Sequence, residues 1–271
     1  LGMNDYINNG NNDLIVSGYL PIDALSVLNN YGDCINFARP VFRPIVDAGV
    51  VTTQGDKAQG TDMIRNGYSL SGAGSKIGII SDSYNQVTTN DDAQVDIDNG
   101  DLPVAGVEVI SDNPNFAGTD EGRAMLQIVH DIAPDAELAF NTGFVSAGAF
   151  AQAILQLRDI GCDIICDDVT YISEPFYSDG LVAQAVDEVA SDGVTYVSAA
   201  GNYGEASYEG TFRIAPAPAG IIGAAHDFGG GDIQQSITLE PGNYTVSLQW
   251  ENDFYSIGNG GADIDLDIYL L

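Results

Sequence analysis

The chain has 271 residues, and its 8 Lys and Arg against 39 Asp and Glu give a formal net charge of −31. Its 45% hydrophobic and 9% aromatic residues are enough for a buried core, which excludes a disordered polypeptide. A surface this acidic repels phosphate groups, so it disfavours nucleic acid and anionic membranes as partners and favours cations. We expect a folded protein that is secreted or held at a cell surface.

The cysteine content and the hydropathy of the sequence exclude further classes of protein. Cys34, Cys162 and Cys166 fit neither a disulfide framework nor a zinc site, because no second cysteine pair or nearby histidine completes one. We interpret all three as buried small hydrophobic residues. No apolar run approaches the ~18 residues of a membrane-spanning helix, and no signal peptide is visible. Because the sequence closes inside an apolar run, we expect it to be a piece of a longer chain.

The first part of the chain predicts a small β-α-β unit. Residues 14–16 and 35–41 have strand patterns, and residues 21–28 between them favour a short helix. Pro40 and Pro44 then stiffen an extended exit into a linker at about residues 45–75.

From residue 76 onward, apolar strands alternate with helices. One helix carries Phe150, Ala153, Ile154 and Leu157 at i, i+3, i+4 and i+7, so it buries one stripe. Parallel strands need crossovers, and helical crossovers predict an α/β fold, a parallel sheet with helices on both faces. We expect strands at 76–81, 106–110, 136–140, 163–166, 194–198 and 221–225, and helices at about 120–131, 147–160 and 180–192.

After residue 228 the hydrophobic period becomes two. Residues 236–239 and 244–250 alternate around a Pro241-Gly242 turn, which predicts antiparallel β structure. We interpret this segment as the start of a β-sandwich, inserted or appended. The predicted domains are the small β-α-β unit with its exit strand at 1–50, an incomplete α/β domain at 51–227 and an incomplete β module at 228–271.

Ligands of an open parallel sheet meet the carboxyl ends of its strands, so polar residues just past each strand are the candidates for a site. A helix that follows a strand begins at this same edge, which adds Glu121, with Thr119 and Asp120 as capping residues. By strand alternation, Asp168 faces the cleft rather than Asp167. The candidates are Asp82, Glu121, Asp168 and Asn202.

The sequence around these residues resembles subtilases over roughly residues 76–226. Ile77-Gly78-Ile79-Ile80-Ser81-Asp82-Ser83 resembles the strand that ends in the catalytic Asp. Gly118-Thr119-Asp120-Glu121-Gly122, with Ala133-Pro134-Asp135-Ala136 after it, resembles the segment that carries the catalytic His. Ser198-Ala199-Ala200-Gly201-Asn202 is similar to the strand end with the oxyanion-hole Asn. The resemblance implies a subtilisin-like fold with Asp82 and Glu121 as catalytic pair, Asn202 in the oxyanion hole and Asp168 in the substrate groove. It also implies that the unit at 1–50 is propeptide-like, because it resembles the end of a subtilase propeptide.

Departures from the subtilase pattern point to an intermediate group. Glu121-Gly122 replaces His-Gly, which is similar to the sedolisins, the serine-carboxyl peptidases whose base is Glu. Sedolisins place an Asp four residues later, where this chain has Met125, and an Asp at the oxyanion position, where it has Asn202. The closest resemblance is to a subtilisin-type frame with Asp and Glu.

A carboxylate base constrains the chemistry. The ordinary pKa of Glu, about 4.3, makes it a poor base toward a serine hydroxyl at neutral pH, so we expect an acidic optimum or a raised pKa of Glu121. His130 lies nine residues further along the same helix and points away. We interpret His226 as a residue of a surface turn.

A turn at residues 96–101 offers oxygen ligands from Asp96, Asp98 and Asp101. Its Gly100 lies one place early for an EF-hand and no Glu closes the loop, so a solvated turn is the alternative. The chemistry requires no cofactor; calcium is the one metal that the sequence suggests.

The leading hypothesis is a secreted subtilase-like serine endopeptidase acting on polypeptides. The Gly-Thr-Ser tripeptide that carries the nucleophile in subtilases and sedolisins is absent, so we expect the serine beyond Leu271 and this chain alone to be inactive. Two alternatives remain: an inactive subtilase-like scaffold that serves as a surface binding or assembly module, and a sugar- or cation-binding protein.

Overall fold

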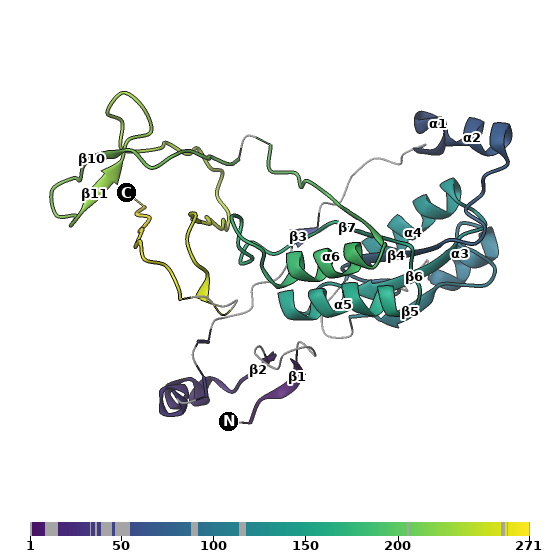
Figure 1. The fold of residues 1–271 in the computed structure, drawn as a ribbon, viewed down its shortest axis with the longest axis horizontal. Helices are drawn as coiled ribbons and strands as arrows, with labels where there is room; N and C mark the ends of the chain where they lie inside the picture. Colours follow the sequence, from purple (N-terminus) through teal and green to yellow (C-terminus); the bar gives the residue numbers. More distant parts are fainter. Residues whose placement is uncertain are drawn as a thin grey trace. The chain divides into compact units, whose positions relative to one another are not determined.

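The computed structural model describes residues 2–8, 16–32, 34–35, 37–38, 45–46, 55–87, 92–113, 118–204, 206–255, 258 and 260–270 (Figure 1). The chain forms two compact units, residues 1–201 with 249–271 and residues 202–248. Within the described ranges, no helix is both long and apolar enough to cross a membrane.

A parallel sheet forms the centre of the first unit. Its strand order is β5-β6-β4-β7-β9, and every neighbouring pair is parallel. In register, Ile80 of β4 lies opposite Asn141 of β6 on one side and Asp167 of β7 on the other. The carboxyl ends of these three strands therefore lie in one row. The strands are β4 (Lys76–Ser81), β5 (Glu108–Ser111), β6 (Glu137–Thr142), β7 (Ile164–Asp167) and β9 (Thr195–Ser198).

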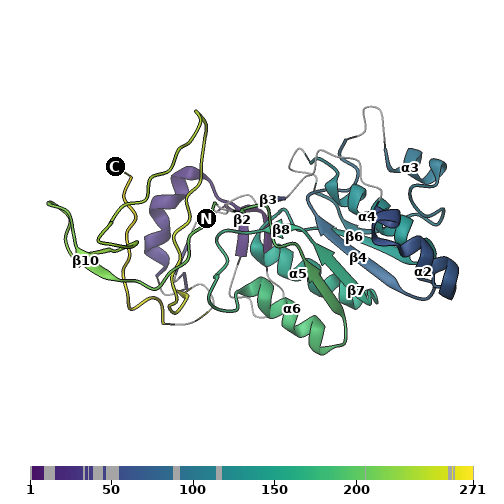
Figure 2. The ribbon, with the colours of Figure 1, turned by 90° about the horizontal axis from the view of Figure 1, so that it is seen from above.

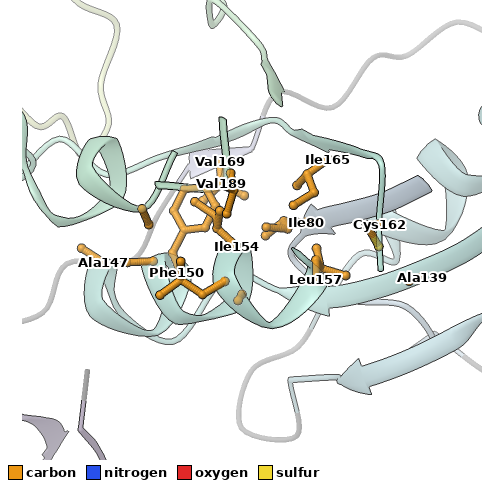
Figure 3. Close-up of a cluster of buried hydrophobic side chains, with 14 of the residues drawn as sticks. Ile80, Ala139, Ala147, Phe150, Ile154, Leu157, Cys162, Ile165, Val169 and Val189 are labelled. Carbon is orange, nitrogen blue, oxygen red and sulfur yellow. The ribbon is translucent and has the colours of Figure 1, made fainter. Parts of the chain in front are cut away.

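Helices α5 (Ala147–Asp159) and α6 (Leu181–Ser191) lie side by side on one face of this sheet (Figures 1 and 2). Their apolar stripes meet Ile80 and Ile165 of the sheet in one buried cluster (Figure 3). Ser146 starts α5, because its hydroxyl accepts a hydrogen bond from the Ala149 amide at 3.1 Å. The i, i+3, i+4 stripe predicted from the sequence is thus confirmed as the core-facing side of α5.

The opposite face of the sheet is covered by α3 (Ala93–Asn99) and α4 (Glu121–Ile132). Leu126 of α4 packs with Ile79 of β4 and Phe140 of β6 in a second cluster. Because Ile79 and Ile80 point to opposite faces, the sheet has helices on both sides. The predicted α/β architecture is therefore confirmed. Helix α3 corrects the turn expected at residues 96–101, since residues 96–99 are helical.

The N-terminal part differs from the predicted β-α-β unit. Strand β1 (Asn4–Asn8) pairs antiparallel with β2 (Val16–Tyr19), and a 3-10 helix follows at Ile22–Tyr31. The strand expected at 35–41 falls partly outside the described residues, and no strand is assigned at 35 or 37–38. Strand β3 (Ile45–Val46) instead pairs antiparallel with β8 (Val169–Thr170).

The predicted linker contains two helices, α1 (Gly55–Gln59) and α2 (Thr61–Tyr68). Arg65 of α2 forms an ion pair with Asp56 of α1 and donates to the carbonyl oxygen of Ile132 at 3.0 Å. This guanidinium therefore ties α1 and α2 to the end of α4. This segment has few apolar residues, and the polar contacts of Arg65 stabilise its two helices. Its composition did not predict these helices.

In the second unit, β10 (Ile214–Pro216) and β11 (Ala224–His226) form an antiparallel pair. The prediction that residues 221–225 form a strand of the parallel sheet is therefore wrong. The strand at this place, β11, belongs to a separate two-stranded sheet with β10. No strand is assigned to the described residues at 236–239 and 244–250. A two-residue period becomes a strand only when a neighbour pairs with its amides and carbonyls, and no such neighbour lies beside these residues in the described part of the chain.

Candidate active site

Asp82 follows β4 directly and is 3% exposed. Its Oδ2 accepts a hydrogen bond from the Thr119 hydroxyl at 2.8 Å and another from the Thr119 amide. Its Oδ1 accepts from the Glu121 amide at 3.1 Å and from the Ser83 amide. A carboxylate that accepts four hydrogen bonds is held in one orientation. Asp82 therefore caps the N-terminus of α4 from another element.

Asp120 is the N-cap residue of α4 by position, but its side chain does not cap the helix. Its backbone has a φ of 58°, in the left-handed region that residues other than glycine rarely adopt. The carboxylate instead accepts hydrogen bonds from the amides of Gln86 at 2.7 Å and Val87 at 2.9 Å. The capping predicted for Thr119 and Asp120 is thus wrong in detail: both residues bind the loop after β4, and Asp82 provides the cap.

Two glycines allow the loop and α4 to approach this closely. A Cβ at Gly118 would lie 2.0 Å from the Ser83 hydroxyl oxygen. A Cβ at Gly122 would lie 2.3 Å from the Phe140 ring and 2.8 Å from the Ser83 carbonyl oxygen. Side chains at these positions would push Glu121 away from the sheet edge. The glycines of the Gly-Thr-Asp-Glu-Gly segment are therefore needed for packing.

Arg123 forms a buried ionic network behind the site. Its guanidinium lies 3.1 Å from Asp96 of α3 and 3.4 Å from Asp120, and all three side chains are at most 8% exposed. It also donates to the Asn85 side chain at 2.9 Å. Two carboxylates around one guanidinium compensate its charge and fix the start of α4 against α3.

Glu121 and Asp168 lie at the same carboxyl edge of the sheet. Asp168 follows β7, the strand next to β4, and its carboxyl group lies near the Glu121 and Ser81 side chains. Burial raises the pKa of Asp168 above its ordinary value, and the nearby negative charge of Asp82 adds to this. The structure therefore brings Asp82, Glu121 and Asp168 together at one edge.

Asp167 has a different role. It is 2% exposed, and its carboxylate accepts hydrogen bonds from the Val169 amide at 3.0 Å and the Ser198 hydroxyl at 3.1 Å. Burial raises its pKa, while these donors and the Tyr196 hydroxyl oppose the increase. Asp167 therefore joins β7 to β9, whereas Asp168 lies near Glu121. The place of Asp168 in a substrate groove stays a prediction.

The remaining predictions concern Asn202, His226 and the cysteines. Asn202 begins the second unit, so its position relative to Asp82 and Glu121 stays a prediction. His226 lies in β11 rather than in a surface turn, where its Nδ1 accepts from the Arg213 amide and its ring packs against Tyr208 and Phe228. Cys34 is exposed, which corrects its interpretation as a buried residue, whereas Cys162 is buried and Cys166 half-buried.

The predicted calcium ligands lie on or next to α3. Asp96 faces Arg123, and the Asp98 carboxylate accepts a hydrogen bond from the Gln94 side chain at 2.8 Å. Among the described residues, no group of three or more His, Cys, Asp or Glu side chains is arranged to hold a metal ion. Calcium binding by Asp96, Asp98 and Asp101 stays a prediction.

No protein-family model matches the chain, and no curated protein matches it either. Among solved structures, the chain is similar to a lanthipeptide protease, with a TM-score of 0.40 and 18% identity over 58% of this chain and 50% of that one. Fervidolysin from Fervidobacterium pennivorans, a keratinolytic enzyme related to subtilisin, gives a TM-score of 0.34 and 14% identity over 60% and 30% of the two chains. MycP1 without its N-terminal propeptide gives a TM-score of 0.34 and 16% identity over 60% and 53%.

The chain thus spans about half the length, or less, of each of these proteins. All three TM-scores lie below 0.5, so the roles of residues in this chain rest on its own geometry.

Proposed function

We propose that this chain belongs to a subtilase-like serine endopeptidase in which Glu121 replaces the usual histidine base. The observation that carries the proposal is the row of Asp82, Glu121 and Asp168 at the carboxyl edge of a parallel sheet. Ligands of such sheets bind at this edge, and a carboxyl group in a buried position can serve as a general base. The motif resemblance over residues 76–226 supports the same reaction class.

In this proposal each residue has a separate task. Asp82 fixes the start of α4 and so positions Glu121, which takes the proton of the attacking serine hydroxyl and later gives it to the leaving amine. Asn202 donates a hydrogen bond to the oxyanion. Asp168 borders the substrate groove. The serine belongs to a Gly-Thr-Ser segment outside residues 1–271, and the substrates are polypeptides outside the cell.

An inactive scaffold that binds other molecules is the alternative function. It is favoured by the absence of a Gly-Thr-Ser tripeptide from the 271 residues. The two proposals differ in one outcome: the natural protein that contains these residues hydrolyses peptide bonds in the first and does not in the second.

The experiment is hydrolysis of a quenched fluorescent peptide by that natural protein and by its Glu121→Gln variant, with Glu137→Gln as the control because Glu137 is an exposed acid on β6. We expect loss of at least 100-fold in kcat/KM for Glu121→Gln, since an amide cannot take the proton, and no change for the control. A fully active Glu121→Gln enzyme ends the carboxylate-base proposal.

A serine-directed fluorophosphonate probe tests the location of the nucleophile. Residues 1–271 alone should stay unlabelled, while the natural protein should incorporate one probe per chain. Stoichiometric labelling of a serine within residues 1–271 would contradict the proposed location.

A further inference from the structure

The loop that follows Asp82 is held in place by acidic side chains. Residues 83–87 belong to no helix or strand, yet each of their backbone amides donates a hydrogen bond to a carboxylate oxygen. Amides outside a helix or sheet need acceptors of another kind, and aspartates supply them here. The acceptors are Asp82 for Ser83, Asp112 for Tyr84 and Asn85, and Asp120 for Gln86 and Val87. The 83–87 loop therefore owes its conformation to aspartates from separate parts of the sequence.

Asp120 binds this loop through both its side chain and its backbone. Its Oδ1 accepts hydrogen bonds from the Ser83 hydroxyl at 3.0 Å and the Gln86 amide at 2.7 Å, and its Oδ2 accepts from the Val87 amide at 2.9 Å. In return, the Asp120 amide donates to the Ser83 hydroxyl oxygen at 2.9 Å. Hydrogen bonds to a carboxylate are stronger than those between neutral groups, and Asp120 is only 5% exposed. These bonds therefore join the 83–87 loop firmly to the start of α4.

A guanidinium compensates the buried charge of Asp120. Arg123 lies 3.4 Å from Asp120 Oδ2, and it also donates to the Asn85 side chain of the loop at 2.9 Å. The Asn85 side chain accepts a further hydrogen bond, at 3.0 Å, from the Ala93 amide at the start of α3. The loop, α3 and α4 thus share one network of polar contacts that includes Asp120.

The backbone of Asp120 determines how Glu121 leaves the loop. Its φ of 58° is left-handed, which costs free energy for residues other than glycine. The hydrogen bonds of Asp120 offset this cost. Glu121 is the next residue and the first of α4, so the backbone at Asp120 sets the direction of the Glu121 side chain.

We propose that Asp120 is a positioning residue for Glu121: its carboxylate holds the 83–87 loop and the left-handed backbone before α4, and these contacts aim the Glu121 side chain toward the substrate. The catalytic part of this inference rests on the proposed function. Both oxygens of Asp120 are bound by the loop, so Asp120 acts through Glu121 and not on the reacting atoms. A displacement of about 1 Å at a catalytic group can lower the rate about 100-fold, so loss of Asp120 should lower turnover without weakening substrate binding.

Two substitutions separate the carboxylate from the backbone conformation. Asp120→Gly removes the carboxylate, and glycine adopts a left-handed backbone without strain. Asp120→Asn tolerates the same backbone and keeps one acceptor oxygen. One control is Asp163→Asn, because Asp163 accepts a hydrogen bond from the Lys76 amide at 2.9 Å, at the opposite end of β4. A second control is Asp187→Asn, at an exposed position of α6.

Amide hydrogen exchange tests the contacts without any activity. In the natural protein that contains these residues, the Gln86 and Val87 amides should be protected, although they lie in a loop. Both should exchange at least about 10-fold faster in Asp120→Gly, whereas Asp120→Asn should keep one of them protected, because its side chain has one acceptor oxygen. The controls should leave both amides protected. Exchange in the wild type as fast as in Asp120→Gly would overturn the inference.

The kinetics of peptide hydrolysis test the positioning role, at a temperature at which circular dichroism shows the variants to be folded. Asp120→Gly should lower kcat about 10- to 100-fold and leave KM within about twofold of the wild-type value. Asp120→Asn should recover part of kcat but still lose at least about threefold, so it decides the question where Asp120→Gly does not fold. Both controls should match the wild type. A loss confined to KM, or full kcat in the Asp120 variants, would contradict the positioning role.

The two proposals fail separately. A natural protein that hydrolyses no peptide, but in which Asp120→Gly frees the Gln86 and Val87 amides, removes the proposed peptidase and leaves the contacts of Asp120. An active peptidase in which Asp120→Gly keeps its kcat removes the positioning role and leaves the peptidase.

Discussion

The Glu121 amide donates a hydrogen bond to Asp82 Oδ1 at 3.1 Å, so the end of β4 caps the start of α4. The two residues are 39 positions apart in the sequence. This bond makes the position of the Glu121 side chain depend on a strand end rather than on local capping. The loop before α4 has a left-handed backbone at Asp120, with a φ of 58°.

Replacing the capping carboxylate should destabilise the fold. In Asp82→Asn the side-chain NH2 group faces the amide and hydroxyl of Thr119, which are both donors. We expect a loss of about 1–3 kcal/mol in the free energy of unfolding, measured in urea, because a buried donor set loses its acceptor. Asp187→Asn should change it by less than about 0.5 kcal/mol. Equal stabilities of the two variants would show that the cap contributes nothing.

A methyl group at Gly122 should separate α4 from the sheet. The Cβ would lie 2.3 Å from the Phe140 ring and 2.8 Å from a carbonyl oxygen, so the backbone must shift. We expect Gly122→Ala to cost about 1–3 kcal/mol. Gly32→Ala is the control, since Gly32 has a φ of −56° and no atom within 4 Å of the added Cβ. A neutral Gly122→Ala variant would contradict the close packing.

Thiol reactivity should separate the three cysteines. Burial raises the pKa of Cys162 and that of Cys166 to about 11 each, whereas Cys34 is exposed. The thiolate is the reactive form, and it predominates only above the pKa. At pH 8 we therefore expect one fast thiol and two slow ones with an aromatic disulfide reagent. Cys34→Ser should remove the fast phase; a fast phase that persists in this variant would contradict the assignment.

The sequence predicted those helices and strands that bury an apolar stripe in the core. Helix α6 and strand β4 match their expected ranges within a residue, because each buries a continuous stripe in the core. It missed α1 and α2, which depend on the polar contacts of Arg65. It also placed strands after residue 233 on a two-residue period, although a period alone does not supply a pairing partner.

The sequence predicted the edge of the sheet at which the candidate site lies, but not the contacts between its side chains. Strand ends placed Asp82, Glu121 and Asp168 at one edge, since parallel strands end together. Which groups contact the Asp82 carboxylate was not predictable, because this depends on side-chain direction and on the loop that Asp120 holds. Alternation distinguished Asp168 from Asp167, because neighbouring residues of a strand point to opposite sides.

Calcium should raise Tm modestly, by mass action on the folded state. Asp98 and Asp101 are exposed carboxylates beside Asp96 in a chain with a net charge of −31. At a calcium concentration equal to the dissociation constant the gain is about 0.4 kcal/mol. The measurement compares Tm in millimolar calcium with Tm in chelator at fixed ionic strength. Asp101→Asn should lose the calcium-dependent increase in Tm. An unchanged Tm in the wild type contradicts the site.

Removing the guanidinium of Arg123 should destabilise the protein more than Asp82→Asn or Gly122→Ala does. Arg123→Met keeps most of the side-chain volume but leaves Asp96 and Asp120 buried without their cation. Breaking such a buried network costs about 3–5 kcal/mol, since the remaining charges have lost their solvation and their partner.

Arg158→Met is the matched control for this change. Arg158 also forms several ion pairs, with Asp159, Glu188 and Asp192, but these partners lie at the surface, where side chains are 48–61% exposed. Water screens exposed pairs, so we expect a loss below about 1 kcal/mol. Urea unfolding at neutral pH should therefore separate the two arginines, and the double variant Arg123→Met with Asp96→Asn should recover part of the loss. Equal losses for Arg123→Met and Arg158→Met would contradict a buried network behind Glu121.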